Sequence, residues 1–369
     1  MPRKDILKGI KRIVVKIGTS TITERGVISE KRLSSFAADI STLRKKGYSV
    51  VIVTSGAISA GATALKMKRE NLTIPQKQAM AAVGQTILMK EYRKTFLSLG
   101  YDVGQILLTE DDVNNRKRFL NVRHTFNTLL DLGVIPIVNE NDSVATEEIR
   151  FGENDILSAH VANVIEAGLL ILLSDIDGFC LDMNNPVPVD AVYDINDDIK
   201  KCAGGSGSVH GTGGMISKIR AAEIIMRSGE MMIIANGKLE NVLSRVMKGE
   251  NIGTVFLDKN RSLSSRKRWI AFNMKTKGKI KIDSGAVTAI CERKKSLLST
   301  GIIESEGTFV LGDAVEIFDE NGKLIGKGIV NYNKNELKLI QGKRTDEIKK
   351  ILGNDYYNEV INRDDLIIY

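Results

Sequence analysis

The chain has 369 residues, 43% of them hydrophobic, with 53 lysines and arginines against 45 aspartates and glutamates. This length allows two or three domains, and the apolar content allows a large buried core. The N-terminal residues are charged, and the longest apolar run, residues 167–173, is too short to span a bilayer. We therefore expect a cytoplasmic globular protein that makes no membrane contact.

The cysteines and histidines exclude several kinds of site. Cys180, Cys202 and Cys291 are odd in number and widely spaced, which argues against a disulfide framework and a zinc site. The three histidines are equally scattered, which argues against a histidine-ligated metal site and against a Ser-His-Asp triad. The sequence also lacks the GxxxxGK[ST] loop, GxGxxG after a strand, the HRD and DFG pair, and GxSxG.

The first 258 residues alternate short apolar runs with longer amphipathic runs. This alternation predicts an α/β fold with an open, mainly parallel sheet and helices on both faces. Gly47 and Gly100 follow two of the amphipathic runs, where a helix end often needs a residue with positive φ. We predict strands at residues 12–17, 49–54, 103–108, 134–138, 169–173 and 231–235, and helices at residues 29–46, 76–99, 119–132, 155–166 and 215–228.

A basic segment separates this part from a different C-terminal pattern. Nine basic residues and no acidic one lie between Lys259 and Lys281, which is typical of a solvated hinge. Short apolar runs with frequent turns follow, and Asn-Gly within residues 319–322 predicts a tight hairpin. We predict strands there at residues 279–282, 289–292, 314–318 and 324–330. The predicted domains are therefore an α/β domain of residues 1–258, a basic linker of residues 259–276 and a small, mostly β domain of residues 277–369.

Four polar segments, three of which contain glycine, lie at the ends of predicted strands or open a predicted helix. They are residues 16–20, 54–61, 139–143 and 151–155. Asp, Asn and Ser also cap helices and form turns, so a single such segment can be purely structural. Ligands collect at the carboxyl ends of strands in open α/β sheets, and four polar ends on one edge favour a binding site there.

Two lysines on glycine-flanked segments indicate what this site does. Lys16 lies near the end of the first predicted strand, two residues before Gly18. Lys218 follows residues 211–214, which contain three glycines. Glycines let backbone N–H groups approach an anion closely, and an ammonium is a mobile point charge suited to phosphate. The pair predicts a phosphoryl-transfer site.

Taken together, these segments resemble the glutamate 5-kinases of the amino acid kinase family over essentially the whole chain. The C-terminal part resembles the PUA domain that many bacterial members carry. Ser174 and Ser217 stand where threonine is expected, and both keep a hydroxyl group. The segments that carry the resemblance are VKIGTS (15–20), VTSGAISAG (53–61), RFLNVRHT (118–125), GVIPIVNEND (133–142), FGEND (151–155), SDIDG (174–178) and GTGGM (211–215) with Lys218, followed by KIDSGA (281–286) in the C-terminal part.

The resemblance implies ATP-dependent phosphorylation of the γ-carboxylate of L-glutamate to γ-glutamyl phosphate, the first step of proline biosynthesis. It assigns catalysis to Lys16, Lys218 and Asp155, with Asp155 holding both lysines by ion pairing. Positioning and charge neutralisation would then supply most of the catalysis. No general base is needed, because a γ-carboxylate is already ionised at neutral pH.

The resemblance also implies the binding residues. Ser55, Asp142 and Asn154 match glutamate-binding positions, and the Asp142 carboxylate suits an α-ammonium group. Mg²⁺ is expected with ATP, held mainly by phosphate oxygens and water because it dehydrates reluctantly. Backbone N–H groups of Gly18 and Gly56 are expected to cradle phosphates. The positions that match ATP contacts are Lys16, Ser174, Asp175, Thr212, Gly213, Gly214, Met215, Ile216, Ser217 and Lys218.

The expected partners follow from the same resemblance. They are proline as a feedback inhibitor, glutamyl phosphate reductase as the acceptor of a labile product, and further copies of the chain in a homo-oligomer. An RNA-binding or RNA-modification role is the alternative, because PUA domains occur in such proteins. The 12 basic and 15 acidic residues of residues 283–369 argue against a phosphate-binding face, so nucleic acid is not expected as a partner. A non-catalytic amino acid sensor is opposed by the retention of both lysines and Asp155.

Overall fold

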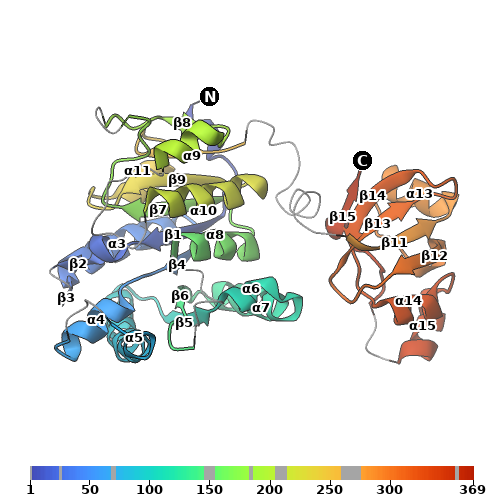
Figure 1. Cartoon of the computed structure of the whole chain (residues 1–369), viewed down its shortest axis with the longest axis horizontal. Coiled ribbons are helices and arrows are strands. Elements are labelled where there is room, and N and C mark those ends of the chain that lie inside the picture. Colours follow the sequence, from blue (N-terminus) through green and yellow to red (C-terminus); the bar gives the residue numbers. More distant parts are fainter. Residues whose placement is uncertain are drawn as a thin grey trace. The chain divides into compact units, whose positions relative to one another are not determined.

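The computed structural model describes residues 2–24, 27–67, 72–144, 154–182, 186–203, 214–258, 276–353 and 357–369 (Figure 1). The chain divides into two compact units. One contains residues 1–226 and 230–260, and the other contains residues 227–229 and 261–369. The predicted domain boundaries stay a prediction, because nearly all of the predicted linker lies outside the described residues.

The first unit is built on an eight-stranded sheet (Figure 1). The six strands predicted from the sequence are all present, with ends that differ by at most two residues, and they pair in parallel. Two short strands at one edge, residues 254–256 and 191–192, were not predicted. Residues 254–256 pair antiparallel with residues 232–234 and parallel with residues 191–192. In spatial order the strands are β5 (Val103–Leu108), β6 (Ile135–Glu140), β4 (Ser49–Val53), β1 (Arg12–Ile17), β7 (Leu169–Ser174), β9 (Met231–Asn236), β10 (Thr254–Phe256) and β8 (Ala191–Val192).

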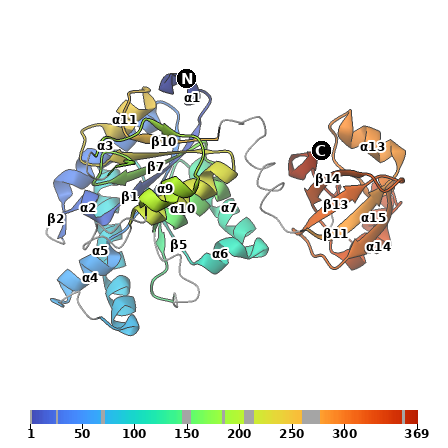
Figure 2. The same cartoon turned by 45° about the horizontal axis from the view of Figure 1, so that its top comes forward.

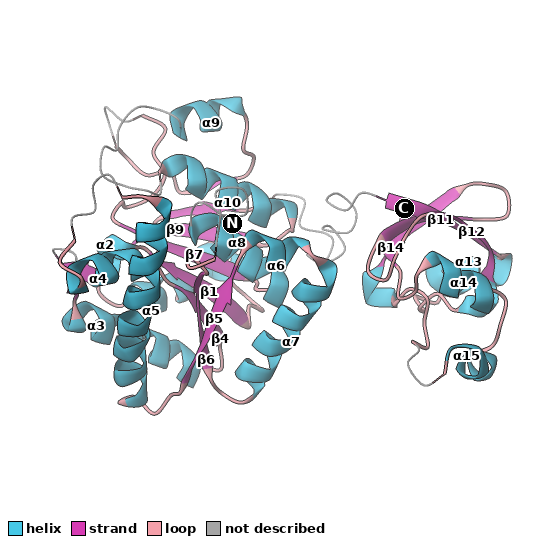
Figure 3. Cartoon of the chain, turned by 60° about the horizontal axis from the view of Figure 1, so that its bottom comes forward, coloured by secondary structure: helices cyan, strands magenta, loops and turns pink. Residues whose placement is uncertain are grey.

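Helices cover both faces of this sheet, and Figure 3 shows them on either side of the strands. Strands buried on both faces need apolar side chains at nearly every position, which explains the continuous apolar runs in the sequence. The helices that pack with one core cluster are α3 (Glu30–Lys45), α5 (Ile74–Leu97) and α11 (Val242–Met247), and those of the other cluster are α7 (Arg116–Asp131), α8 (Asn154–Ile165) and α10 (Met215–Arg227).

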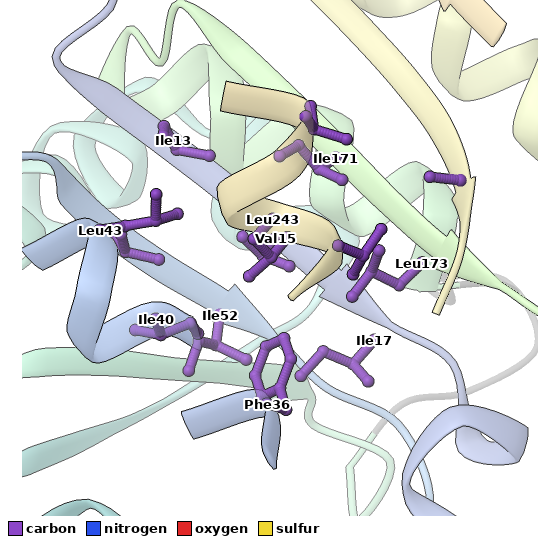
Figure 4. Packing of buried hydrophobic residues seen from close by; sticks show 14 of the residues in the cluster. Ile13, Val15, Ile17, Phe36, Ile40, Leu43, Ile52, Ile171, Leu173 and Leu243 are labelled. Carbon is purple, nitrogen blue, oxygen red and sulfur yellow. The ribbon is translucent and has the colours of Figure 1, made fainter. Parts of the chain in front are cut away.

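Alternate residues of β1 enter the two clusters. Val15 contributes to the α3 side and Val14 to the α8 side, and both are fully buried. Figure 4 shows the α3 side, where Phe36 and Ile40 of α3 pack near Ile52 of β4. Each such aliphatic or aromatic side chain stabilises the fold by about 1.5–3 kcal/mol when it is fully buried.

The smaller elements of the first unit connect these layers. They are α1 (Arg3–Ile6), α2 (Thr19–Ile22), β2 (Thr23–Glu24), β3 (Val27–Ile28), α4 (Ala57–Ala64), α6 (Glu110–Asn114) and α9 (Asp197–Ala203).

Helices α4 and α5 pack with their backbones almost in contact. A Cβ atom on Gly84 would lie 1.7 Å from the carbonyl oxygen of Ala57, and one on Gly61 would lie 1.9 Å from that of Met80. Only glycine fits at both positions. The long helix α5 begins with a capping box, in which Thr73 and Gln76 bond each other's backbone N–H groups. Together these features fix α5 beside the end of β4.

The second unit is a five-stranded sheet with helices packed around it (Figure 2). The strands of residues 276–282 and 314–318 pair in parallel, and the other neighbouring strands pair antiparallel. The predicted hairpin is confirmed, because Gly322 has φ of 79° and the Asp319 N–H donates to the Lys323 carbonyl. The elements are β12 (Ile302–Gly307), β11 (Thr276–Ile282), β13 (Ala314–Phe318), β14 (Leu324–Ile329), β15 (Leu366–Ile368), α13 (Ser284–Cys291), α14 (Lys334–Ile340) and α15 (Thr345–Leu352), with short 3-10 turns at Ser299–Gly301 and Arg363–Asp365.

One strand prediction is wrong in this unit. Residues 289–291 form the end of α13 and Glu292 is its C-cap, so they do not form a strand. Asp283 caps this helix, its side chain accepting a hydrogen bond from the Ala286 N–H at 2.7 Å. A short apolar run such as Ala289-Ile-Cys291 looks the same in a strand and in the last turn of a helix, and here the upstream cap decides.

No helix in the described part of the chain is long and apolar enough to cross a membrane.

Candidate active site

The polar segments predicted to form a site follow neighbouring strands of the first sheet. Strands β6, β4, β1 and β7 are adjacent and parallel, so their carboxyl ends share one edge. Asp142 follows β6, Ser55 follows β4, Lys16 is the penultimate residue of β1 and Ser174 ends β7. This is the edge at which ligands bind in open α/β sheets.

Asp155 joins the two predicted catalytic lysines. Its Oδ1 atom lies 2.6 Å from Lys16 Nζ, and its Oδ2 atom lies 3.1 Å from Lys218 Nζ. The Ser217 hydroxyl also donates to Oδ2, at 2.9 Å. The side chains of Lys16, Lys218 and Asp155 are only 11%, 8% and 1% exposed. The structure thus brings together three residues that are 202 positions apart at most in the chain.

The electrostatics of this trio favour the charged forms. Burial by itself would raise the pKa of Asp155, but the charges of Lys16 and Lys218 outweigh burial and lower it below its usual value. Hydrogen bonds from Lys16 and Ser217 act in the same direction. Two positive groups share one negative group, so the three side chains together carry a charge of about +1 at neutral pH. A buried cluster with a net positive charge favours the binding of an anion.

The local structure explains why Asp155 can take this place. Asn154 and Asp155 are the first two residues of α8, where the unpaired N–H groups of a helix favour a carboxylate. The Ser158 hydroxyl donates to the Asp155 carbonyl oxygen at 2.6 Å and tightens this first turn. Lys218 lies in the first turn of α10, and the Ser217 hydroxyl also contacts the Gly214 carbonyl oxygen at 2.8 Å.

A cluster of amide and hydroxyl groups lies at the ends of β4 and β6. The Asn154 side-chain NH₂ donates to the Thr54 carbonyl oxygen at 2.7 Å and to Ser55 Oγ at 2.9 Å. It also donates to Asn139 Oδ1 at 3.0 Å. Two of the three predicted glutamate-binding residues, Ser55 and Asn154, are therefore in direct contact. Asp142, the third, is half-buried in the turn after β6.

The predicted phosphate-cradling glycines lie at two neighbouring strand ends. Gly56 precedes α4 with φ of 107°, a conformation that L side chains rarely adopt, and a Cβ atom there would lie 3.6 Å from Thr19 Cγ2. Gly18 precedes α2, and its N–H donates to the Leu173 carbonyl oxygen at 3.3 Å, a bond that it would have to give up to bind phosphate. Their contact with phosphate stays a prediction.

The predicted ATP-binding residues are partly described. The Ser174 hydroxyl contacts Asp175 Oδ1 at 3.1 Å, and the Asp175 side chain is exposed. At the start of α10, Met215 is half-buried and Ile216 is 46% exposed. Thr212 and Gly213 lie outside the described residues.

Asn139 and Gln85 were not predicted as site residues, although they are buried next to Asn154. The Asn139 side-chain NH₂ donates to Gln85 Oε1 at 2.9 Å, and their residues are 2% and 9% exposed. A glutamine in the middle of a long helix is usually solvated, so composition gave no signal for Gln85. Its place one residue after Gly84, on the face of α5 that packs inward, is the sequence feature that could have found it.

The fit of Mg²⁺ can be judged from the available ligands. Among the described residues, no group of three or more His, Cys, Asp or Glu side chains could hold a metal ion. The buried Asp155 carboxylate already contacts two ammonium groups. That Mg²⁺ is held by phosphate oxygens and water stays a prediction.

Comparisons with known proteins agree with this fold. Residues 11–236 match the amino acid kinase family, and residues 278–352 match the PUA domain. A carbamate kinase from Giardia superposes with a TM-score of 0.50 at 15% identity, over 68% of this chain and all of that one. A carbamate kinase from Giardia lamblia bound to AMP-PNP gives 0.51 at 14% identity, over 68% of this chain and 99% of that one. These structural similarities concern the fold alone.

The sequence relatives are far closer. The glutamate 5-kinase of Caldanaerobacter subterraneus subsp. tengcongensis is 47% identical over 97% of this chain and 97% of its own. The glutamate 5-kinase of Syntrophotalea carbinolica is 45% identical over 99% of each chain. That of Dictyoglomus thermophilum is 46% identical over 97% of each chain. The chain therefore belongs to the amino acid kinase family and, within it, to the glutamate 5-kinases.

Proposed function

We propose that this protein transfers the γ-phosphoryl group of ATP to the γ-carboxylate of L-glutamate, giving γ-glutamyl phosphate and ADP. This reaction is the first step of proline biosynthesis. The observation that carries the proposal is the buried trio of Lys16, Asp155 and Lys218 at the carboxyl edge of the sheet, in a chain that matches glutamate 5-kinases over its whole length.

The trio suits the electrostatic demand of this reaction. Two anions, a carboxylate and a triphosphate, must approach each other, and their repulsion is the main barrier to alignment. Lys16 and Lys218 would contact the oxygens of the transferring phosphoryl group from two sides. Asp155 holds both ammonium groups in place before the substrates arrive, so little reorganisation is needed as charge develops.

The neighbouring polar cluster would hold the amino acid. Ser55, Asn154 and Asp142 are assigned to glutamate, with the Asp142 carboxylate directed to the α-ammonium group. Backbone N–H groups at Gly18, Gly56 and the start of α10 are assigned to the phosphates of ATP. The attacking γ-carboxylate is ionised at neutral pH, so no residue has to remove a proton from it.

MgATP is proposed as the nucleotide substrate. The metal would neutralise part of the phosphate charge, with its ligands supplied by phosphate oxygens and water. The side chains of Ser174 and Asp175 and the N-terminal turn of α10 are the described groups assigned to the nucleotide.

Regulation and assembly form the rest of the proposal. Proline shares the α-amino and α-carboxylate groups of glutamate but lacks the reacting γ-carboxylate, so it fits the same cluster as a competitor. The acyl phosphate product is labile, which favours direct use by glutamyl phosphate reductase. A homo-oligomer is proposed on general grounds, since soluble oligomers are mostly symmetric assemblies of identical chains.

The proposal is tested by a coupled ADP-release assay with MgATP and a panel of acidic amino acids. L-Glutamate should support turnover at least ~10²-fold faster than L-aspartate or N-acetyl-L-glutamate, since a misplaced acceptor loses most of the advantage of alignment. Equal turnover with either competitor would contradict the assignment of the substrate.

A further inference from the structure

Three amide side chains from three different elements, two of them buried and that of Asn154 half-buried, form one hydrogen-bonded chain. Gln85 lies on α5, Asn139 in β6 and Asn154 at the start of α8. Asn139 bonds to Gln85 Oε1 at 2.9 Å through its NH₂ group and accepts from the Asn154 NH₂ group at 3.0 Å through Oδ1. The chain therefore links a helix remote from the lysines to a residue of the proposed glutamate site.

The main chain sets the orientation of the Asn139 amide. The main-chain N–H of Glu140 donates to Asn139 Oδ1 at 3.0 Å, and a backbone N–H in a strand can only donate. Asn139 must therefore present its oxygen to Glu140 and Asn154, and its NH₂ group to Gln85. Gln85 Oε1 accepts from this NH₂ group, so both ends of the Asn139 amide are hydrogen-bonded. A rotation of the amide would break these bonds.

The same logic fixes the amide of Asn154. Its neighbours Asn139 Oδ1 and the Thr54 carbonyl oxygen are both acceptors, so only the NH₂ group can face them. Asn154 Oδ1 is buried and has no hydrogen-bond partner among the described residues. An unpaired buried carbonyl costs free energy, which a ligand that donates to it would recover.

A second polar contact ties α5 to the same place. Tyr92 lies seven residues after Gln85, two helical turns along the same face, and its hydroxyl contacts Thr54 Oγ1 at 2.8 Å. Both atoms are buried, and Thr54 is the residue whose carbonyl oxygen receives the Asn154 NH₂ group. Helix α5 thus contacts the ends of β4 and β6 at the points that hold Asn154.

We propose that Gln85 is a positioning residue that, through Asn139, holds the Asn154 carbonyl oxygen as the acceptor for the α-ammonium group of the amino acid substrate. The inference rests on the proposed function and refines it. Gln85 contacts neither substrate in this scheme. Its effect is on the orientation of Asn154, and so on the affinity for glutamate rather than on phosphoryl transfer.

The test compares three single variants in steady-state assays with glutamate and ATP varied separately. Gln85→Leu removes the acceptor for Asn139 while it keeps a helix-forming residue of similar size. We expect the KM for glutamate to rise at least ~10-fold, with the KM for ATP and kcat close to wild type and a lower Tm, because the buried Asn139 NH₂ group loses its acceptor. Gln85→Glu keeps an oxygen facing the Asn139 NH₂ group and should recover most of the loss. Thr86→Ala, at an exposed neighbour on α5 whose hydroxyl bonds only within the helix, is the matched control.

A double-mutant cycle separates positioning from general packing. If Gln85 acts through Asn139, then Gln85→Leu combined with Asn139→Leu should raise the KM for glutamate no further than Asn139→Leu alone. Isothermal titration with L-glutamate in the absence of nucleotide should show the same pattern in Kd. Since Gln85→Leu is expected to lower stability, Gln85→Met offers the same loss of hydrogen bonding with a more adaptable side chain.

Several results would overturn the inference. They are an unchanged KM for glutamate in Gln85→Leu and Gln85→Met, equal rises in the KM values of both substrates, or additive effects in the cycle. If the wild-type enzyme still phosphorylates glutamate, such a result contradicts only the role of Gln85, and the proposed function is unaffected. A wild-type enzyme that does not use glutamate removes both proposals.

Discussion

At the scale of single residues, Asp155 determines how the site is organised. It is the one described carboxylate that contacts both Lys16 and Lys218, and its side chain is 1% exposed. Without an anion at this position, two ammonium groups would be buried side by side, which is costly in a low dielectric. The trio therefore depends on all three charges, and the loss of any one should change both remaining groups.

Replacement of Lys218 by alanine tests this dependence. Lys218→Ala removes one positive group from the reacting centre, while Lys16 still balances Asp155. We expect kcat to fall at least ~10²-fold, in line with the loss of other electrostatic stabilisers, with the fold retained by circular dichroism. Lys201→Ala, which alters an exposed lysine of α9 paired with Asp198 at 3.8 Å, is the control and should stay near wild type. A Lys218→Ala enzyme that keeps most of its kcat would exclude Lys218 from catalysis.

His160 on α8 gives the chain a predicted sensitivity to acid. Burial lowers the pKa of His160 from 6.5 to about 4, so the folded protein holds it neutral at pH 6. Between pH 6.5 and 4 the unfolded chain binds this proton more readily, and stability therefore falls as pH is lowered through that range, by about 3 kcal/mol at most. His160→Gln should flatten this part of the pH dependence of the free energy of unfolding, measured by urea unfolding. Identical slopes for wild type and His160→Gln would contradict the assignment.

The predicted ion pairs of Asp155 are present in the structure, and the catalytic roles assigned to its partners stay predictions. Lys16, Lys218 and Asp155 could be read from the sequence, because each belongs to a distinctive segment at a strand or helix end, and the structure brings them into contact. Gln85 belongs to no such segment, and Asn139, although it lies in the polar segment 139–143, was given no role of its own. Their role depends on which helix face meets which strand, and that information appears only when the chain is folded.

At the scale of elements, the glycines of α4 and α5 decide how closely these helices approach. Gly84→Ala would place a Cβ atom 1.7 Å from the Ala57 carbonyl oxygen, so the two helices must move apart. We expect a loss of about 1–3 kcal/mol in the free energy of unfolding, as for other overpacked interiors, together with a higher KM for glutamate because Gln85 moves with α5. Gly100→Ala, at a positive-φ glycine with no atom within 4 Å of the added Cβ, separates backbone strain from packing. An unchanged Tm and KM in Gly84→Ala would show that the helix pair is not tightly constrained.

The elements themselves were largely predictable. Long periodic helices such as α3 and buried strands such as β1 have patterns that leave little choice, and both are found within one residue of the prediction. Short elements carry too few residues for a pattern. Thus β8 and β10 were missed, and residues 289–292 were taken for a strand although a helix that is capped at Asp283 ends there.

At the scale of the whole molecule, the hydrophobic cores of the two units are separate in the described part of the chain. The two clusters of the first unit contain buried residues between positions 7 and 257, and the third cluster contains buried residues between positions 280 and 366. The described residues assigned to catalysis and substrate binding all precede position 219.

A chain that ends at Asp258 should therefore fold and phosphorylate glutamate. The first unit keeps its whole described core, including the buried Leu257, and domain boundaries tend to fall in polar connectors such as the one that follows. The measurements are kcat, the KM values for both substrates, and Tm against the full-length protein. Proline sensitivity and oligomeric state are free to change, because the lost unit can affect them from outside the site. An insoluble or inactive product, with the full-length chain active beside it, would mean that the second unit is structurally required.

The central claim is that this site phosphorylates the γ-carboxylate of L-glutamate, and trapping of the product tests it most directly. With MgATP, L-glutamate and hydroxylamine, the full-length protein should form γ-glutamyl hydroxamate, identified by mass spectrometry and by NMR of the acylated carbon, in step with ADP release. Lys218→Ala should lose this product, and L-aspartate should not replace L-glutamate. ADP release without any hydroxamate, formation of the α-hydroxamate, or an equal yield of aspartyl hydroxamate would contradict the account.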